Sequence, residues 1–296
     1  MTTQHSQLAP KHFQYIPLAV LATLLSIYMG LLWRYDDTAH LGMSALFILA
    51  TGMLLWEQRQ TKQLTPNHRG LLLGIFGIVL TLGLSRFLFQ QQAIVPGDPL
   101  NTPSVVVPLR LLPALIAISV SVLASGLAGI RQFWREEVLL LALGLPGVIA
   151  LFLADISPLT AMFSAGLLQV GGFDVVREGV LINLPNGTVE VYYGCSGMES
   201  ICYLLSLSAL FLILFPVSGF RQYMAPISGI VLGFVINSFR VALMAILWAA
   251  RDVERFDYWH EGEGSLIFGL MAVIAFGAFY VGVLQNLESR QTASTL

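Results

Sequence analysis

The most reactive stretch of the chain is residues 192–199, Tyr-Tyr-Gly-Cys-Ser-Gly-Met-Glu, in which glycines flank Cys195-Ser196. A polar segment precedes it and a long apolar run follows, which places Cys195 at the start of a helix. Small neighbours let a substrate backbone approach the thiol, and the first turn of a helix favours a thiolate or an oxyanion. Cys195 is therefore a candidate nucleophile, and the alternative is a packed, inert thiol.

The second candidate is Arg240, because it interrupts the apolar run from Gly229 to Trp248. An arginine inside a membrane helix costs about 2.5–3.5 kcal/mol, so it normally faces a partner or a cavity. Asn237 lies three residues earlier, on the same helical face, and could orient the guanidinium. We expect Arg240 to be functional, with snorkelling as the structural alternative. Snorkelling explains Arg86 and Arg110, near other proposed helix ends.

The third candidate is His260, which stands in a loop before the last apolar run. Imidazole side chains exchange protons around pH 6.5, close to neutrality, so a histidine suits proton transfer. The alternatives are a solvated loop histidine or a metal ligand together with Glu261 and Glu263. Neither a His-Glu-x-x-His helix nor a second nearby histidine supports a metal site.

Composition identifies a membrane protein. The 296 residues are 56% hydrophobic and 11% charged, with mean hydropathy +0.77, whereas soluble domains carry about a quarter charged residues. The net charge of −2 gives no indication of nucleic-acid binding. The two cysteines, Cys195 and Cys202, are too few for a disulfide framework. Cys202 lies deeper in its apolar run and is expected to pack.

Apolar runs of about the length of a membrane span recur along the chain. They predict an all-α polytopic protein, a single domain over residues 1–296, with about eight spans at Phe13–Trp33, Ala39–Trp56, Leu71–Phe89, Val107–Ile130, Val138–Ala154, Met198–Pro216, Gln222–Ala250 and Ser265–Leu284.

Basic residues between the runs set the orientation. With the N-terminus inside, eight inner residues stand against four outer ones, and they are Lys11, Arg59, Lys62, Arg69, Arg131, Arg135, Arg221 and Arg290 against Arg34, Arg177, Arg251 and Arg255. The excess predicts that both termini are cytoplasmic. In this topology Cys195, Arg240 and His260 all fall on the outer side, although none of them served to set it.

The long segment before Cys195 is expected to hold a short surface helix at Pro158–Val170 and then a β-hairpin. Two β-prone runs, 180–184 and 189–192, flank Asn186-Gly187, a pair that favours a type I′ turn. Open sheet edges do not occur in lipid, so we expect this hairpin on the extracytoplasmic side, where it leads to Cys195.

The ordered set Gly-Cys-Ser-Gly at 194–197, Asn237-x-x-Arg240 and His260-Glu261-Gly262, with intervals of 45 and 20 residues, resembles the exosortase/archaeosortase family. The likeness covers residues 163–284, and the first half and the hairpin are similar to the cyanobacterial branch, the cyanoexosortases. Archaeal members are described with arginine in the third position, so the histidine resembles the bacterial enzymes.

The resemblance implies a cysteine transpeptidase or protease of the cell membrane, without a cofactor. It assigns the family's catalytic Cys, Arg and His to Cys195, Arg240 and His260. We expect Asn237, Glu199 and Ser196 to bind substrate or to support these three residues. The implied partners are surface proteins whose C-terminus carries a Pro-Glu-Pro-type motif, a membrane helix and a basic cluster. Such an enzyme forms a thioester, which an acceptor amine or water resolves.

Other functions stay open on the sequence. In a transporter or channel, Arg240 would bind an anion, and inverted repeats are expected but not found. A non-catalytic assembly protein would bind partner helices. A membrane protease could instead use Ser196 or a metal.

Overall fold

The structure is a computed structural model that describes residues 15–62, 64–91, 103–260 and 263–285. Lys11, Arg290, Glu261 and Gly262 lie outside the described residues. The chain forms two compact units, residues 1–148 and 149–296, which are described separately.

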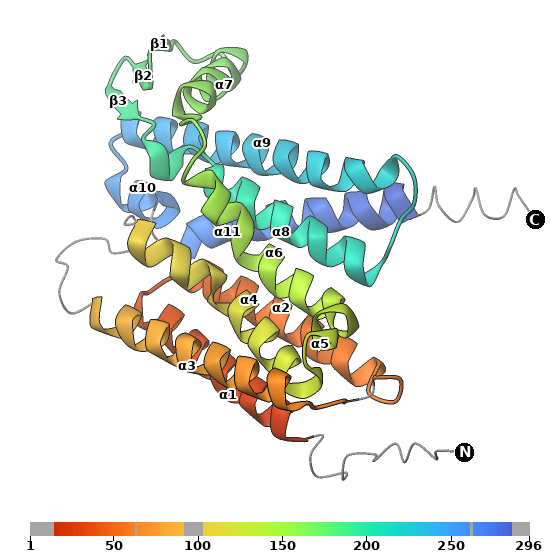
Figure 1. Cartoon of the computed structure of the whole chain (residues 1–296). Helices are drawn as coiled ribbons and strands as arrows, with labels where there is room; N and C mark the ends of the chain where they lie inside the picture. Colours follow the sequence, from red (N-terminus) through yellow and green to blue (C-terminus); the bar gives the residue numbers. More distant parts are fainter. Residues whose placement is uncertain (1–14, 63, 92–102, 261–262, 286–296) are drawn as a thin grey trace, which may run out of the picture. The chain divides into compact units, whose positions relative to one another are not determined.

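In the residues that the structure describes, the regular elements of the first unit are all helices (Figure 1). Its helices are α1 (Tyr15–Arg34), α2 (Thr38–Glu57), α3 (His68–Gln91), α4 (Pro103–Ser125), α5 (Ala128–Gln132) and α6 (Trp134–Ala150), the last of which ends just inside the second unit. The predicted run Val107–Ile130 is wrong as one helix, because the chain leaves α4 at Gly126 with φ +62° and restarts as α5. Glycine adopts such a φ without steric cost.

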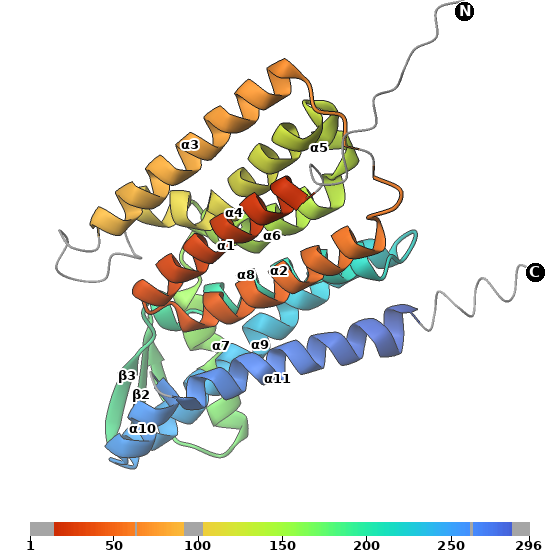
Figure 2. The ribbon, with the colours of Figure 1, turned by 90° about the horizontal axis from the view of Figure 1, so that it is seen from below.

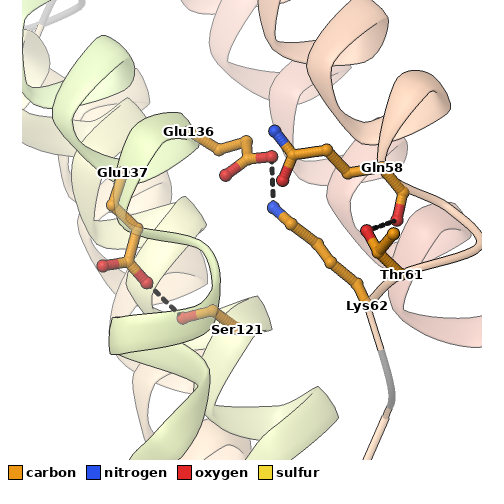
Figure 3. A network of polar contacts seen from close by, with 6 residues as sticks. All are labelled: Gln58, Thr61, Lys62, Ser121, Glu136 and Glu137. Atoms are coloured by element: carbon orange, nitrogen blue, oxygen red, sulfur yellow. Dashed lines mark hydrogen bonds and ion pairs between the residues drawn. The ribbon is translucent and has the colours of Figure 1, made fainter.

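Two largely buried basic side chains of the first unit form ion pairs with carboxylates. Arg110 on α4 lies 2.8 Å from Asp37 Oδ2, and both side chains are largely buried. The expected snorkelling of Arg110 is therefore wrong, because a nearby carboxylate keeps the guanidinium inside. Figure 3 shows a second pair, Lys62 with Glu136, beside the hydrogen bond from Ser121 to Glu137.

The second unit holds a small sheet, three long or intermediate helices and two short ones (Figures 1 and 2). Its elements are α7 (Ser157–Val170), β1 (Val176–Glu178), β2 (Leu181–Leu184), β3 (Gly187–Glu190), the 3₁₀ turn η3 (Tyr193–Cys195), α8 (Met198–Leu214), α9 (Arg221–Ala249), α10 (Val253–His260), α11 (Glu263–Phe279) and the π-helical end η4 (Tyr280–Gln285).

Among the described residues, six helices are long and apolar enough to cross a membrane, namely α1, α2, α3, α4, α9 and the stretch Gly264–Leu284. Each of the eight predicted apolar runs is mostly helical in the part of the chain that the structure describes, but α6 and α8 have 17 residues each and are shorter than a typical span. The chain is thus a multi-pass membrane protein, and the count of eight spans stays a prediction.

The predicted hairpin is part of a three-stranded antiparallel sheet of order β1-β2-β3. Leu184 pairs with Gly187, so Pro185-Asn186 forms the turn. The predicted type I′ turn is wrong, because neither Asn186 nor Gly187 has a positive φ. The positive φ falls instead on Gly179, at +64°, in the β1–β2 turn, as at the first central residue of a type II′ turn.

Gly187 has a different role, which is to let β3 approach helix α9. A Cβ built there would lie 2.9 Å from Trp248 Cδ1 and 3.3 Å from Ala249 Cα. The buried face of the sheet, with Ile182 and Val191, packs in one core with Val241 of α9.

Helices α8 and α9 also pack closely. Gly229 and Gly233 lie four residues apart on α9, and a Cβ on either would come about 3.0 Å from the backbone of α8, at Leu204 and Ile201. Small residues at this spacing let membrane helices approach each other. The next position in the same row is Asn237, which therefore faces the start of α8.

Candidate active site

Cys195 ends the 3₁₀ turn η3 and precedes α8 by three residues. The sequence predicted Cys195 at the start of a helix, and the structure places it in the short turn directly before that helix. Its amide donates to Tyr192 O at 2.9 Å. The chain then reverses at Gly197, whose φ of +89° and tight contact with Asn237 favour glycine. The thiol is buried and forms no disulfide.

Cys195 and His260 meet although 65 residues separate them in the chain. The Sγ atom lies 3.5 Å from His260 Nε2, within hydrogen-bonding range for sulfur. A thiol and an imidazole at this distance are the two parts of an activated nucleophile. The structure also selects the nitrogen, since Nε2 is the one that faces the thiol.

His260 is the last residue of helix α10, not a loop residue as predicted. Phe256, one helical turn earlier, stacks on the imidazole with ring centroids 5.2 Å apart and an interplanar angle of 24°. Trp248 of α9 packs on Phe256 in turn. The ring of His260 is thus supported from a rigid helix.

Arg240 binds the backbone that carries this histidine. Its Nη2 donates to His260 O at 2.6 Å, and its Nε donates to Trp259 O at 3.3 Å. These carbonyls belong to the last turn of α10, where intrahelical donors run out. The guanidinium therefore caps α10, and Arg240 does not belong to the lining of the pocket around the thiol, as far as the described residues define it.

Asn237 binds the backbone that carries the cysteine. Its Nδ2 donates to Cys195 O at 2.8 Å, and the side chain is buried. The sequence predicted that Asn237 would orient the guanidinium of Arg240, but its amide holds the cysteine turn. One helix, α9, thus contacts both reactive residues from positions three apart.

A pocket of about 210 Å³ opens at the thiol. Cys195, His260 and Tyr192 line it together with residues of β3, α9 and α10. The hydroxyl of Tyr192 lies 3.3 Å from His260 Nε2, so this nitrogen faces both the phenol and the thiol. Sequence reasoning gave Tyr192 no role, although an aromatic hydroxyl three residues from a candidate nucleophile was a usable signal.

Two supporting residues lie away from this pocket. Ser196 is fully buried, and its hydroxyl accepts from the amide of Met198 at 3.3 Å, so it stabilises the start of α8. Glu199 is exposed and accepts from Tyr203 Oη at 2.8 Å. Cys202 is buried in a small core with Met198 and Ala150, in agreement with a packing role.

Helix α7 contributes residues that the sequence did not indicate. Thr160 donates to Ser196 O at 2.6 Å, and Ser164 donates to Ser238 O at 3.0 Å. Both side chains are buried, so α7 ties the cysteine turn to α9. Beside them, Tyr193 donates to Ala150 O at 3.3 Å, and partial burial raises the pKa of its phenol, which stays protonated at neutral pH.

The arrangement can activate a thiol and transfer its proton. The metal alternative involved Glu261 and Glu263; the first lies outside the described residues, and so does the side chain of the second.

Comparison with known proteins identifies the family of the chain. The family model for the transmembrane exosortase matches residues 33–277, a range that includes Cys195, Arg240 and His260. No curated protein and no solved structure matches the chain. Since the matched range covers most of the sequence, the chain belongs to the transmembrane exosortase family.

Proposed function

We propose that the protein is a membrane-embedded cysteine transpeptidase or protease that cleaves the C-terminal sorting signal of surface proteins. The observation that carries this proposal is the 3.5 Å approach of Cys195 Sγ to His260 Nε2 inside a pocket. Membership of a family of cysteine-type sorting enzymes supports it.

In the first step, His260 Nε2 takes the proton of the Cys195 thiol, and the thiolate attacks a peptide carbonyl. A tetrahedral oxyanion forms. The C–N bond then breaks, and the imidazolium gives its proton to the departing amine. The product is a thioester between Cys195 and the surface protein.

In the second step, an acceptor amine or water attacks the thioester and gives a proton to His260. The C–S bond breaks and the thiolate recovers that proton. An amine transfers the surface protein to the acceptor, whereas water releases it.

Arg240 supports both steps. Through the carbonyls of Trp259 and His260 it fixes the end of α10 and with it the base. The two hydrogen bonds use two of the five N–H donors of a guanidinium. Because the guanidinium lies next to the backbone of His260, its positive charge can stabilise an oxyanion that forms in the pocket.

The substrates we propose are surface proteins with a Pro-Glu-Pro-type motif, a membrane helix and a basic cluster, presented laterally through the lipid. We place the site on the extracytoplasmic side of the cell membrane and both termini in the cytoplasm. A small sheet with open edges, such as β1–β3, fits the aqueous side of a bilayer better than its hydrocarbon core.

The decisive experiment expresses Cys195→Ala and Cys195→Ser in cells with a tagged substrate carrying such a tail, and follows its size on a gel. Both variants should leave the substrate at full length. Cys202→Ala is the matched control, because this thiol packs in a core, and it should process normally.

Processing by Cys195→Ala would exclude the cysteine mechanism and favour a transporter, in which Arg240 binds an anion, or an assembly protein. Cleavage that is blocked by a chelator but not by thiol alkylation would instead favour a metal-dependent protease.

A further inference from the structure

We propose that the substrate binds as an additional strand on the free edge of β3, so that its backbone is fixed by strand pairing before Cys195 attacks. This inference rests on the proposed function and specifies the bound form as an extended peptide. It concerns the segment Gly187–Tyr192, which runs from the sheet to the cysteine turn.

The edge of β3 is open in the described part of the chain. The strand order is β1-β2-β3, so β2 is the only described strand that pairs with β3. The amide of Val191 donates to Val180 O at 2.9 Å, which fixes the phase of the ladder. Because hydrogen-bonded and non-bonded pairs alternate in an antiparallel ladder, Gly187 and Val189 also point their backbone groups at β2.

Thr188 and Glu190 must then point their N–H and C=O groups away from β2. Opposite Asn183 and Leu181 they form the non-bonded pairs of the ladder. A row of such outward groups is a template for pairing with another extended chain. This is the mode of peptide recognition in which main-chain hydrogen bonds supply affinity.

The open edge borders the pocket of the reactive thiol. Residues 188–192 form one wall of this pocket, Cys195 and His260 lie in it, and the other walls are apolar and belong to α9 and α10: Val241, Met244, Trp248 and Phe256. The views agree that α10 and the end of α9 lie near β3 (Figures 1 and 2). The side chains of a strand added here would lie between apolar walls. One of its backbone carbonyls would lie near Cys195 Sγ.

Strand pairing has a signature that other binding modes lack. In an extended peptide, alternate residues direct their amides to the same side. N-methylation of a residue whose amide faces β3 removes a hydrogen bond, whereas N-methylation of the next residue does not.

The test uses synthetic peptides with a Pro-Glu-Pro motif, the following segment and the membrane helix, each N-methylated at one position that is not proline. Full-length enzyme in lipid nanodiscs processes them. We expect kcat/KM to fall about ten-fold at every second position and to change little between. Equal losses at all positions, with the unmethylated peptide still processed in a Cys195-dependent manner, would overturn strand pairing alone. Failure to process the unmethylated peptide would overturn the proposed function as well.

A pair of enzyme variants tests the same edge from the protein side. Glu190→Pro removes an outward N–H from β3. Arg177→Pro is the matched control, because Arg177 pairs with Ile182 without facing β2 and so points outward from the opposite edge, on β1. Proline is tolerated where the N–H faces away from the sheet.

Glu190→Pro should lower kcat/KM for the peptide about ten-fold, mainly through KM, while Arg177→Pro leaves it within two-fold. Thermal unfolding of both variants checks that the sheet is intact. Equal kcat/KM for the two folded variants would overturn the inference.

Discussion

Two arginines, one in each unit, lie within helices long enough to cross a membrane, but their partners differ. Arg110 of α4 pairs with the carboxylate of Asp37 at 2.8 Å. Arg240 of α9 binds two backbone carbonyls, and among the side chains that the structure describes, which do not include those of Glu261 and Glu263, no carboxylate forms an ion pair with it.

The difference separates a structural arginine from one suited to chemistry. The carboxylate of Asp37 cancels the charge of Arg110, so this pair contributes little to the electrostatic potential at a distance. Two carbonyl groups accept from Arg240, and its positive charge lies next to the proposed base. A partly buried cation beside the base is useful where negative charge develops during a reaction.

The largest expected effect is on the stability of the first unit. Arg110→Met leaves the buried Asp37 carboxylate unpaired, which should cost about 3–5 kcal/mol. Thermal unfolding in detergent measures the loss, and the protein that stays folded should process substrate at the normal rate. The double variant Arg110→Met/Asp37→Asn should recover most of the stability, because asparagine can still accept from the amide of His40 at the start of α2. No recovery would mean that Arg110 acts through something other than Asp37.

For Arg240 we expect the opposite result, a larger effect on the rate of processing than on stability. Arg240→Met is expected to reduce the rate of processing about 10²–10³-fold, because it removes a charge and the cap of α10 together. Arg240→Lys keeps the charge but cannot bind both carbonyls in the same geometry. Its rate of processing should therefore lie between the rates of the native protein and of Arg240→Met. Single-turnover processing in nanodiscs measures both variants. If Arg240→Met lowers the unfolding temperature as Arg110→Met does and leaves the rate of the folded fraction unchanged, the proposed contrast is wrong.

Two tyrosines, one in each unit, allow the same comparison between a role in the reaction and a role in stability, with smaller expected effects. Tyr192 reaches His260 Nε2, whereas Tyr28 shares a hydrogen bond of 3.1 Å with Ser44 inside the first unit. Tyr192→Phe should slow processing about three- to ten-fold, the value of one hydrogen bond. Tyr28→Phe should affect only stability, by about 0.5–1.5 kcal/mol. Equal rates for the two variants would exclude a role for the Tyr192 hydroxyl in orienting the base.

The long helices were predictable from sequence because a bilayer demands long apolar runs, and each of the eight runs is mostly helical where the structure describes it. Among the short elements, α7 and the hairpin of β2 and β3 were also predicted, but β1 and α10 were not. β1 (Val176–Glu178) has three residues, two of them charged, and no alternation marks it as a strand. Helix α10 was predicted as a loop because its eight residues are mostly polar and no apolar run announces them.

The sequence also predicted which residues would be brought together, but not how they bind. The order of apolar runs brought Cys195, Arg240 and His260 to one side. The partners of Asn237 and Arg240 depend on the close contact of α8 with α9 and on the turn after α9, where Arg251 has a φ of +59°. These are tertiary features that no local pattern encodes.

The bonds from Asn237 and Arg240 have a mechanical consequence. Helix α9 has 29 residues and is about 43 Å long, more than the roughly 30 Å of hydrocarbon in a bilayer, so it must tilt or extend beyond it. A membrane that thins or thickens changes that tilt. Cys195 and His260 are both hydrogen-bonded to the same short section of α9, so they move together with it when the helix tilts. The distance between Cys195 Sγ and His260 Nε2 should therefore change little when the thickness of the membrane changes.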